Sequence, residues 1–325
     1  MTRVLITALI GFVASGVLGY ILLPLLRALK TGQSVHDIGP TWHNTKVGTP
    51  LMGGLMFVGA TILCLLINLP KTEEYTAFYV LAISFCFGLV GFLDDFCKVK
   101  FKRDLGLTAF QKAALQMAVS AIYLYVLYKT GVMTSDLYIP FVNITVYIHP
   151  IIYIFFAMFV MVGCVNAVNL TDGVDGLCGS VTIPVMVFFT AAAVAMGKWD
   201  LAVLPAALVG GLFAYLIYNW HPAKVFMGDT GSLFLGGVVC AMAFAMDMPL
   251  VLILVGFVYI VETLSDIIQV LYFKITHGKR IFKMAPIHHH FEMCGWKEVK
   301  IVLVFSAVSA LMCVVAWFSI SGLVG

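Results

Sequence analysis

Apolar residues occupy most of the chain in long runs, and short polar stretches separate one run from the next. A helix that crosses a membrane needs about 20 consecutive apolar residues. Ten runs reach or approach this length, at residues 4–23, 51–69, 77–93, 113–128, 150–168, 179–196, 201–218, 233–246, 248–273 and 301–320. The eighth run is short, and its boundary with the ninth consists only of Asp247 to Pro249. The pattern predicts an all-α polytopic membrane protein with about ten transmembrane helices, formed as a single domain over residues 1–325.

Composition and charge agree with this prediction. The chain is 62% hydrophobic and 11% charged, whereas a soluble domain carries roughly 25% charged residues. Of the 19 lysines and arginines, fifteen fall in the odd-numbered loops, counted from the first helix, and four fall on the opposite side. Because cytoplasmic loops carry an excess of Lys and Arg, we expect the odd-numbered loops in the cytoplasm and both termini outside.

The outer loops are short apart from residues 134–149, whose pattern predicts a small β-hairpin at the membrane interface. The eight cysteines contain no Cys-x-x-Cys pair and lie mostly in apolar runs. We therefore expect them to be small buried hydrophobic side chains rather than disulfides or zinc ligands. The sequence shows no internal repeat and no linker between domains.

The most polar interruption of the apolar pattern is the segment from Asn166 to Leu177. It contains Asp172 and Asp175, each adjoined by a glycine, so the backbone can turn there and approach a ligand closely. Polar groups that a membrane fold does not require are candidates for function. An ordinary turn between two helices, with one of the two aspartates as a helix cap, explains the same residues. The other loops on the same side have to distinguish the two interpretations.

The second inner loop starts with the adjacent carboxylates of Asp94 and Asp95 and continues through several basic residues, which include Lys98 and Lys112. Adjacent carboxylates raise each other's pKa, and a divalent cation or lysines would relieve their repulsion. Mg²⁺ and ammonium groups jointly neutralise phosphate, so the pattern favours a phosphate-containing ligand. The alternative is the solvated start of an ordinary loop.

The fourth inner loop runs from Asn219 to Ser232, and its Asp229 is followed by small and hydroxylated residues that begin the next helix. Backbone N–H groups at such a helix start favour anions. Phe226 could stack on a nucleobase, or it could pack at the membrane interface. In the first inner loop, Lys46 follows a polar stretch and precedes a turn rich in glycine and proline. It is placed to meet an anion, or it is one more cytoplasmic lysine.

The fifth inner loop contains three consecutive histidines, His288, His289 and His290. They could bind zinc, although adjacent residues cannot easily present all their ligands to one ion. Imidazoles beside a diphosphate fit the pattern equally well. All of the unusual polar residues thus fall in loops on one side of the membrane. This distribution suits an enzyme in which a charged cytosolic substrate meets a molecule in the lipid.

Four stretches resemble the polyprenyl-phosphate hexosamine-1-phosphate transferase superfamily: Asp94 to Lys98, Asn166 to Leu177, Phe226 to Asp229, and Ala285 to Glu292. The run Pro-Ile-His-His-His-Phe-Glu, followed by Gly-Trp, is typical of the phospho-N-acetylmuramoyl-pentapeptide transferases within it. The resemblance covers nearly the whole chain. It implies ten helices, Mg²⁺, a cytoplasmic site and a homodimer. The implied reaction moves phospho-MurNAc-pentapeptide from UDP to undecaprenyl phosphate, giving lipid I and UMP.

The resemblance also implies roles for individual residues. Asp229 would be the Mg²⁺ ligand, and uridine would lie between Phe226 and the Asn169–Asp175 loop. The implied catalytic residues are Asp94, Asp95, Lys98, Lys112, Asp229, His288, His289 and His290. The implied substrate-binding residues are Lys46, Asn169, Asp172, Asp175, Asn219, Phe226, Gln269 and Ala285. Two residues depart from the family pattern, because Leu51 stands where a threonine is usual and Asp266 where an apolar residue is expected.

Three other classes of protein share parts of this pattern. An ion-coupled transporter would place carboxylates near the bilayer midplane and would often show repeats, yet only Glu262 and Asp266 lie within an apolar run. An intramembrane aspartyl protease is suggested by Gly228 and Asp229, but its acids would lie within helices. A related transferase that uses UDP-GlcNAc is the nearest alternative.

Overall fold

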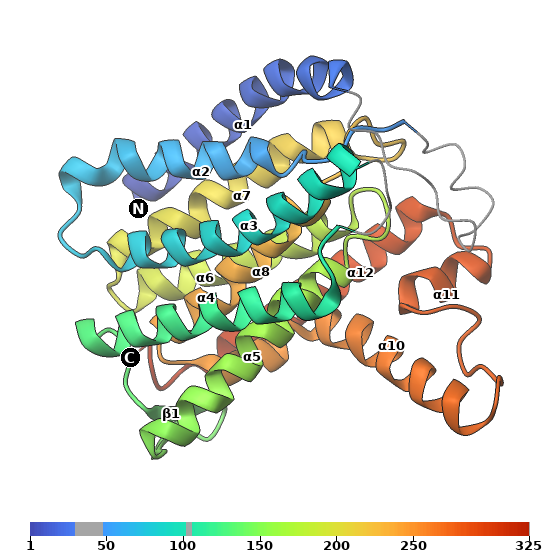
Figure 1. The fold of residues 1–325 in the computed structure, drawn as a ribbon. Coiled ribbons are helices and arrows are strands. Elements are labelled where there is room, and N and C mark those ends of the chain that lie inside the picture. The colour runs from blue at the N-terminus through green and yellow to red at the C-terminus, as the bar shows by residue number, and fades with distance from the viewer. Residues whose placement is uncertain (30–47, 102–105, 325) are drawn as a thin grey trace.

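The computed structural model describes residues 1–29, 48–101 and 106–324, and helices form nearly all of the regular structure in this part of the chain (Figure 1). The helices and strands are, in order, α1 (Thr2–Ala28), α2 (Leu55–Asn68), α3 (Thr76–Phe101), α4 (Ala109–Thr130), β1 (Asp136–Ile139), β2 (Ile144–Tyr147), α5 (Pro150–Leu170), α6 (Leu177–Ala195), α7 (Trp199–Asn219), α8 (Gly228–Ala245), α9 (Leu252–Val255), α10 (Phe257–Ile275), α11 (Ile287–Met293) and α12 (Glu298–Ser319). Short 3₁₀ turns cover Leu69–Lys71 and Pro249–Val251. The predicted all-α class is confirmed.

Eight of the described helices are long and apolar enough to cross a membrane, and α9 with α10 would make a ninth if the bent pair counts as one span. Because α2 is shorter than these, the predicted number of ten is not confirmed. The prediction of one continuous helix over residues 248–273 is wrong. The chain breaks at Gly256, and the helical segments on either side differ in direction by 80°. This break directs α10 away from the other helices (Figure 1).

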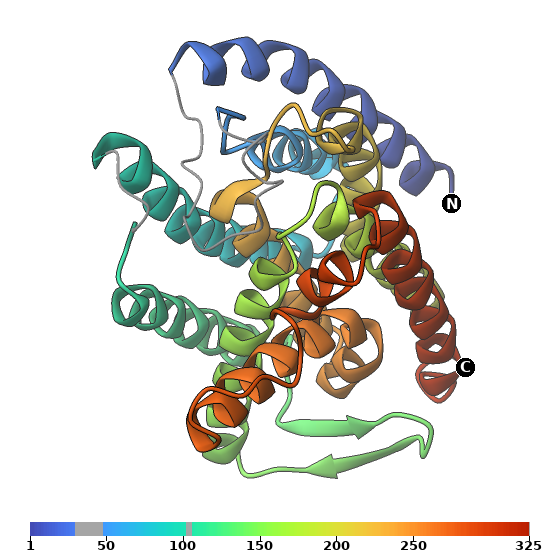
Figure 2. The ribbon, with the colours of Figure 1, turned by 90° about the vertical axis from the view of Figure 1, so that its right-hand side faces the viewer.

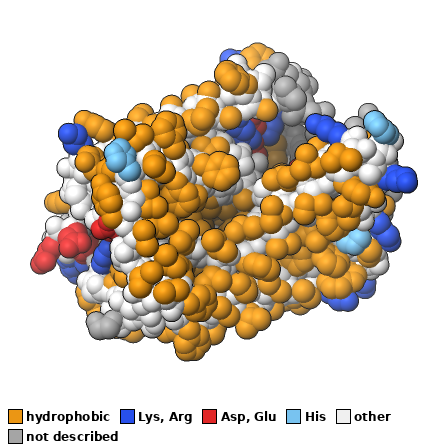
Figure 3. All heavy atoms as spheres, turned by 90° about the horizontal axis from the view of Figure 1, so that it is seen from below, with side chains coloured by type: hydrophobic (Ala, Val, Ile, Leu, Met, Phe, Trp, Pro, Cys, Tyr) orange, Lys and Arg blue, Asp and Glu red, His pale blue; other side chains and the backbone are white. Residues whose placement is uncertain are grey.

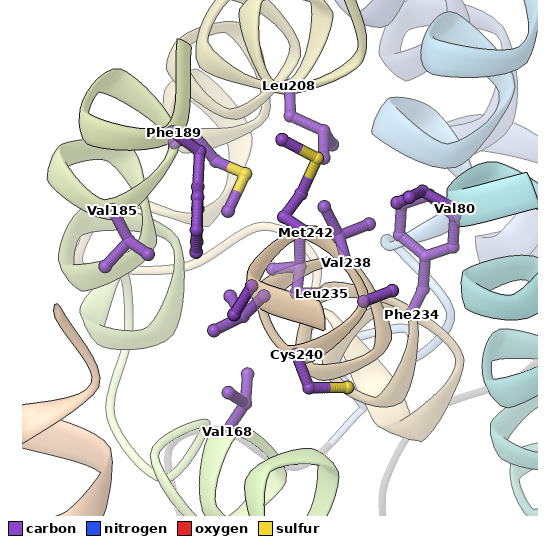
Figure 4. Close-up of a cluster of buried hydrophobic side chains, with 14 of the residues drawn as sticks. Val80, Val168, Val185, Phe189, Leu208, Phe234, Leu235, Val238, Cys240 and Met242 are labelled. Atoms are coloured by element: carbon purple, nitrogen blue, oxygen red, sulfur yellow. The ribbon is translucent and has the colours of Figure 1, made fainter. Parts of the chain in front are cut away.

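Helix α8 forms the centre of the bundle and is buried along nearly its whole length. Side chains from the surrounding helices pack against it, among them Val80 of α3, Val168 of α5 and Leu208 of α7 (Figure 4). Small residues allow membrane helices to approach closely. A Cβ added to Gly236 of α8 would stand only 2.7 Å from the Cα of Val165 in α5. The middle of α8 therefore packs directly against α5.

The two termini lie at one end of the bundle, and α11 lies at the other (Figure 1). The predicted hairpin is present at the terminal end, where Asp136 pairs opposite Tyr147 and the hydroxyl of Tyr138 donates to the carbonyl of Ser319 at 3.0 Å. Its two strands project below the helices in Figure 2. On the face shown in Figure 3, apolar side chains cover most of the surface and charged side chains gather toward its two ends. This distribution is that of a multi-pass membrane protein.

Candidate active site

Three carboxylates meet where the end of α3 lies against the start of α8. Asp94 and Asp95 lie in the last two turns of α3, and Asp229 is the second residue of α8. One oxygen of each lies within 4.8 Å of the others. The helices can approach this closely because Gly91 has no side chain, since a Cβ there would stand 2.0 Å from the carbonyl oxygen of Asp229.

Two ammonium groups neutralise part of this negative charge. Lys98 follows Asp94 by four residues, so the two side chains lie on the same face of α3. Its Nζ lies 2.6 Å from Oδ2 of Asp94 and 3.3 Å from Oδ2 of Asp229. Lys112 lies in the first turn of α4, which a capping box begins. Its Nζ donates to the same oxygen of Asp229 and lies 3.9 Å from Oδ2 of Asp94.

Asp95 has a different environment from the other two acids. It is 1% exposed, and it accepts hydrogen bonds from the backbone N–H of Asp229 at 3.1 Å and from the N–H and hydroxyl of Thr230 at 2.9 and 2.7 Å. The first N–H groups of a helix have no partner within the helix. Asp95 satisfies two of them, and it therefore fixes the start of α8 and the place of the Asp229 carboxylate.

Asn169, in the last turn of α5, connects the polar segment after α5 to the acids. Its Nδ2 donates to Oδ1 of Asp229 at 2.9 Å and to Oγ of Ser232 at 2.8 Å. One oxygen of Asp229 thus contacts Asn169 and the other contacts both lysines. Side chains from α3, α4 and α5 together hold this one carboxylate.

The loop at residues 171–176 carries two more of the predicted site residues, and the interpretation of either one as the cap of α6 is wrong. The N-cap of α6 is Gly176, with no side-chain hydrogen bond. Asp172 is half-buried. Its pKa is raised well above the usual range, mainly because burial disfavours the charged form and also because Asp229 and other nearby acids are negative. Asp175 is buried, and its Oδ2 accepts from the backbone N–H of Ala223 at 3.0 Å.

The loop between α7 and α8 lies against this segment. Oδ1 of Asn219 accepts from the N–H of Gly176 at 2.9 Å, and its Nδ2 donates to the carbonyl of Val225 at 2.8 Å. Phe226 is half-buried, and its backbone N–H donates to the carbonyl of Pro50 at 2.9 Å. Asn219 therefore connects the 171–176 loop to the loop between α7 and α8. Phe226 lies three residues before Asp229 of the acid cluster.

The three histidines have separate contacts. His288 is buried, and its Nδ1 lies 2.9 Å from Oε2 of Glu262 in α10. The Nδ1 of His289 lies 2.6 Å from Oε2 of Glu292, while the Nδ1 of His290 accepts from the N–H of Lys283 at 3.1 Å. In the described part of the chain, His288 is thus the histidine that connects two helices.

The remaining predicted residues lie around these groups. Oε1 of Gln269 accepts from the N–H of Ile281 at 3.1 Å and from that of Phe282 at 3.0 Å, so Gln269 shapes the chain between α10 and α11. Ala285 is half-buried at the approach to α11, and Asp266 is half-buried on α10. Lys46 lies outside the described residues.

The structure therefore brings together one compact group of predicted residues, namely Asp94, Asp95, Lys98, Lys112, Asn169 and Asp229. Thr230 and Ser232 contact this group, and Glu262 contacts His288; the sequence interpretation gave none of the three a role. Thr230 and Ser232 could have been found from the sequence. They follow Asp229 at the start of a predicted helix, where hydroxyl side chains commonly form hydrogen bonds with neighbouring acids. Glu262 stood out in the sequence only as an acid in an apolar run.

Oxygen ligands of the carboxylate type suit hard divalent cations, and the three acids at the α3–α8 contact offer such a set. A second set could also hold a metal, formed by Asp175, His221 and Glu298. In that set, however, Nδ1 of His221 already lies 3.0 Å from Asp175. The first set has two ammonium groups beside it, as expected where a metal and cations neutralise a phosphate together.

Comparison with known proteins gives the class of the chain. Residues 77–247 match the glycosyl transferase family 4 model, so the chain is a membrane transferase of that class. A phospho-N-acetylmuramoyl-pentapeptide-transferase of Clostridium acetobutylicum is 45% identical over 98% of this chain and 100% of its own length. Proteins of the same name from Clostridium botulinum and Clostridium perfringens are each 46% identical over 98% of this chain and cover 96% and 99% of their own lengths. The chain belongs to the phospho-N-acetylmuramoyl-pentapeptide-transferase family.

Proposed function

We propose that this protein transfers phospho-MurNAc-pentapeptide from UDP-MurNAc-pentapeptide to undecaprenyl phosphate, giving lipid I and UMP, with its active site at the cytoplasmic face of the membrane. The observation that carries the proposal is the carboxylate of Asp229, which two ammonium groups and one amide hold at the end of a membrane helix. A charged diphosphate can meet a lipid-borne phosphate at such a place.

Asp229 would hold Mg²⁺, and the bound ion would neutralise charge on the diphosphate of the donor. Lys98 and Lys112 would supply the remaining positive charge. Both ammonium groups now contact Asp229, and both lie within reach of Asp94. The same side chains can therefore bind phosphate oxygens without a large movement of the helices.

The acceptor is a phosphate monoester, and its second pKa is about 6. At neutral pH most of it is a dianion, so a general base is hardly needed. The main obstacle is the repulsion between two phosphate groups, and electrostatic stabilisation should carry most of the rate. In direct in-line attack, an oxygen of the acceptor forms a bond to the phosphorus next to the sugar, and UMP leaves with the electron pair of the broken bond. Asp94 would position the acceptor or deprotonate its minor monoanion.

A two-step path through a phospho-aspartate is the alternative to direct attack. It requires that protein incubated with the donor, without lipid acceptor, releases UMP and retains the labelled phospho-sugar. A stoichiometric adduct on Asp94 would contradict direct attack. Under direct attack, Asp94→Asn should lose less activity as the pH rises above about 7, because the dianion no longer needs help.

The uridine of the donor would lie between Phe226 and the Asn169–Asp175 loop, where a carboxylate such as that of Asp175 can accept from the uracil N3–H. Stacking on an aromatic ring contributes roughly 1–3 kcal/mol. Phe226→Ala should therefore raise the KM of the donor by about tenfold or more. An unchanged KM would exclude the stacking contact.

The three histidines would serve the sugar-diphosphate rather than a structural metal. Zinc analysis of active, chelator-washed protein checks this, and stoichiometric zinc that follows activity would contradict it. We further propose a homodimer, which the mass of the protein in a detergent-free nanodisc would establish or refute.

The experiment that tests the function offers radiolabelled UDP-MurNAc-pentapeptide and UDP-GlcNAc in parallel to the purified protein with undecaprenyl phosphate. The proposal predicts a labelled lipid from the first donor alone. Label in lipid from UDP-GlcNAc would identify the related GlcNAc-1-phosphate transferase instead. Movement of an ion or solute across vesicles, without any lipid product, would favour a transporter.

A further inference from the structure

A buried carboxylate–imidazole pair lies behind the loop at residues 171–176. Glu262 of α10 is 0% exposed and His288 of α11 is 1% exposed, and Oε2 of the acid lies 2.9 Å from Nδ1 of the ring. Glu262 lies within an apolar stretch of sequence, on the helix that follows the 80° bend at Gly256. An isolated buried charge is very costly unless it is paired. The acid therefore needs this histidine as its partner.

Each partner has one further polar atom that is buried. Oε1 of Glu262 and Nε2 of His288 accept or donate no hydrogen bond within the described part of the chain. Most buried polar atoms in proteins are paired, and an exception calls for an explanation such as a functional role or a missing ligand. Two such atoms in a single pair indicate a group that is held ready for another partner.

The unpaired nitrogen faces the loop that carries Asp172 and Asp175. A Cβ added to Gly173 would stand 2.2 Å from Nε2 of His288 and 2.7 Å from Cε1. The Nε2 edge of the ring therefore lies directly against the backbone of Gly173, and no side chain fits between them. Glu262 of α10 holds the ring at Nδ1, and the opposite edge of the ring is directed toward the loop assigned to the donor.

What Nε2 can offer a ligand depends on where the hydrogens of the pair lie. In a pair without net charge, Nε2 carries a hydrogen in both forms: an ionised Glu262 beside an imidazolium ring, or a protonated Glu262 that donates to Nδ1 of a neutral ring. With an ionised Glu262 and a neutral ring, Nδ1 donates to the acid and Nε2 is an acceptor. A phosphate oxygen accepts hydrogen bonds, so a pair without net charge is the form that suits it.

We infer that Glu262 is a positioning residue of the reaction. It fixes the ring of His288 so that the Nε2–H, which lies against Gly173 in this structure, meets an oxygen of the phospho-sugar part of the donor when the loop at residues 171–176 moves away from the ring. This inference rests on the proposed function, because it assigns the missing partner of Nε2 to that donor. Residues behind a metal-binding histidine orient its ring and select its protonated nitrogen, and their loss typically costs about 10–100-fold in activity; Glu262 has the same position behind a histidine that would bind the donor.

The test measures kcat and the donor KM for Glu262→Ala, Glu262→Gln, His288→Ala and the double variant Glu262→Ala/His288→Ala. Glu262→Ala should lower kcat by about 10–100-fold and change KM by less than about threefold. Glu262→Gln keeps a hydrogen-bonding partner for Nδ1 and should recover at least about fivefold of the lost kcat. The double variant should be no slower than His288→Ala alone, because the acid acts through the ring.

Ser265→Ala is the matched control, because it removes a buried hydrogen bond of 2.7 Å to the carbonyl of residue 262 and leaves the carboxylate in place. Its kcat should stay within about twofold of the wild type. Melting temperatures of all variants separate folding from function. Wild-type kcat in folded Glu262→Ala would overturn the inference, as would losses that multiply in the double variant or an equal kcat for the Ala and Gln variants.

The outcome also separates this inference from the proposed function. If the wild type uses UDP-GlcNAc instead, the proposed function fails, and the same variants are compared with that donor because it brings the same diphosphate. If the wild type turns over neither donor, both are overturned. If the wild type is active but the effects of Glu262→Ala and His288→Ala multiply in the double variant, the inference is overturned and the proposed function stands.

Discussion

At the scale of the residue, Asp172 is an acid whose surroundings oppose its charge. Burial and the nearby carboxylates of Asp229, Asp95 and Asp175 raise its pKa in the folded protein. Unfolded, its pKa is about 3.9. The folded state therefore binds the proton more tightly than the unfolded state. As the pH rises above the unfolded value, Asp172 lowers the stability of the fold, and the loss is complete above the folded pKa.

Asp172→Asn should remove this penalty, because an amide resembles the protonated acid. In metal-free buffer the variant should melt at a higher temperature than the wild type at about pH 8, and the difference should close as the pH falls toward about 4. Its transfer activity should fall, because Asp172 is assigned to the donor site. Melting curves across this pH range provide the measurement. A variant that melts at or below the wild-type temperature at about pH 8 would refute the account of this residue.

The sequence identified the residues of the acid cluster but not their contacts. It predicts a loop from Asp94 onward, whereas α3 continues to Phe101, so Asp94 and Lys98 lie on one face of a helix and form an ion pair at 2.6 Å. Glu262 and His288 are separated by a helix end and a loop, so no local pattern relates them. In the sequence, Glu262 stands out only as an acid within an apolar run, and its partner at 2.9 Å gives it a place beside the site.

At the scale of the element, the contact between α3 and α8 controls the site. A Cβ at Gly91 would stand 2.0 Å from the carbonyl oxygen of Asp229 and 2.7 Å from the backbone nitrogen of Thr230. A side chain at this position cannot be accommodated unless the two helices separate. Such a separation would move Asp229 away from both lysines.

Gly91→Ala should therefore lower the transfer rate by at least about tenfold, since a displacement of about 1 Å can cost about 100-fold. It should also lower the melting temperature. Gly163→Ala in α5 is the control, because a Cβ there meets no atom within 4 Å. That variant should keep its activity and should be equally stable or more stable, by up to about 1 kcal/mol. If both variants behave alike, close packing of α3 on α8 does not position the site.

The sequence predicted most elements because hydrophobic length alone defines a membrane helix. Each of the predicted runs overlaps a described helix, and the boundary at Asp247 to Pro249 separates α8 from a 3₁₀ turn at Pro249–Val251. The break at Gly256 could not be predicted in this way. The apolar run continues through it, and hydropathy reports the length of a segment and not its direction. The direction depends on packing against helices that are distant in the sequence.

At the scale of the whole molecule, the termini and the hairpin lie at one end and α11 at the other (Figure 1). The distribution of Lys and Arg predicts that the end with α11 faces the cytoplasm. Thr145 lies exposed on β2, and Cys294 lies exposed directly after α11. The two positions therefore report opposite sides of the membrane.

A membrane-impermeant maleimide added to intact cells should label Thr145→Cys in a Cys294→Ser background. The wild-type Cys294 should react only after the membrane is permeabilised, and the Cys294→Ser protein without a new cysteine gives the background signal. The reverse pattern would place the termini inside and would move the proposed site to the outer face.

The central claim is that a single acid, Asp229, organises the transfer. The direct measurement uses a donor labelled in the phosphate next to the sugar and compares wild type, Asp229→Asn and Asp200→Asn. Asp200 lies at the terminal end, where it pairs with Arg3 and accepts backbone N–H groups, so its variant should melt at a lower temperature but transfer label. Asp229→Asn should remain folded and transfer label at least about 10²–10³-fold more slowly. Transfer by Asp229→Asn within about tenfold of the wild type, with the same dependence on Mg²⁺, would contradict the account.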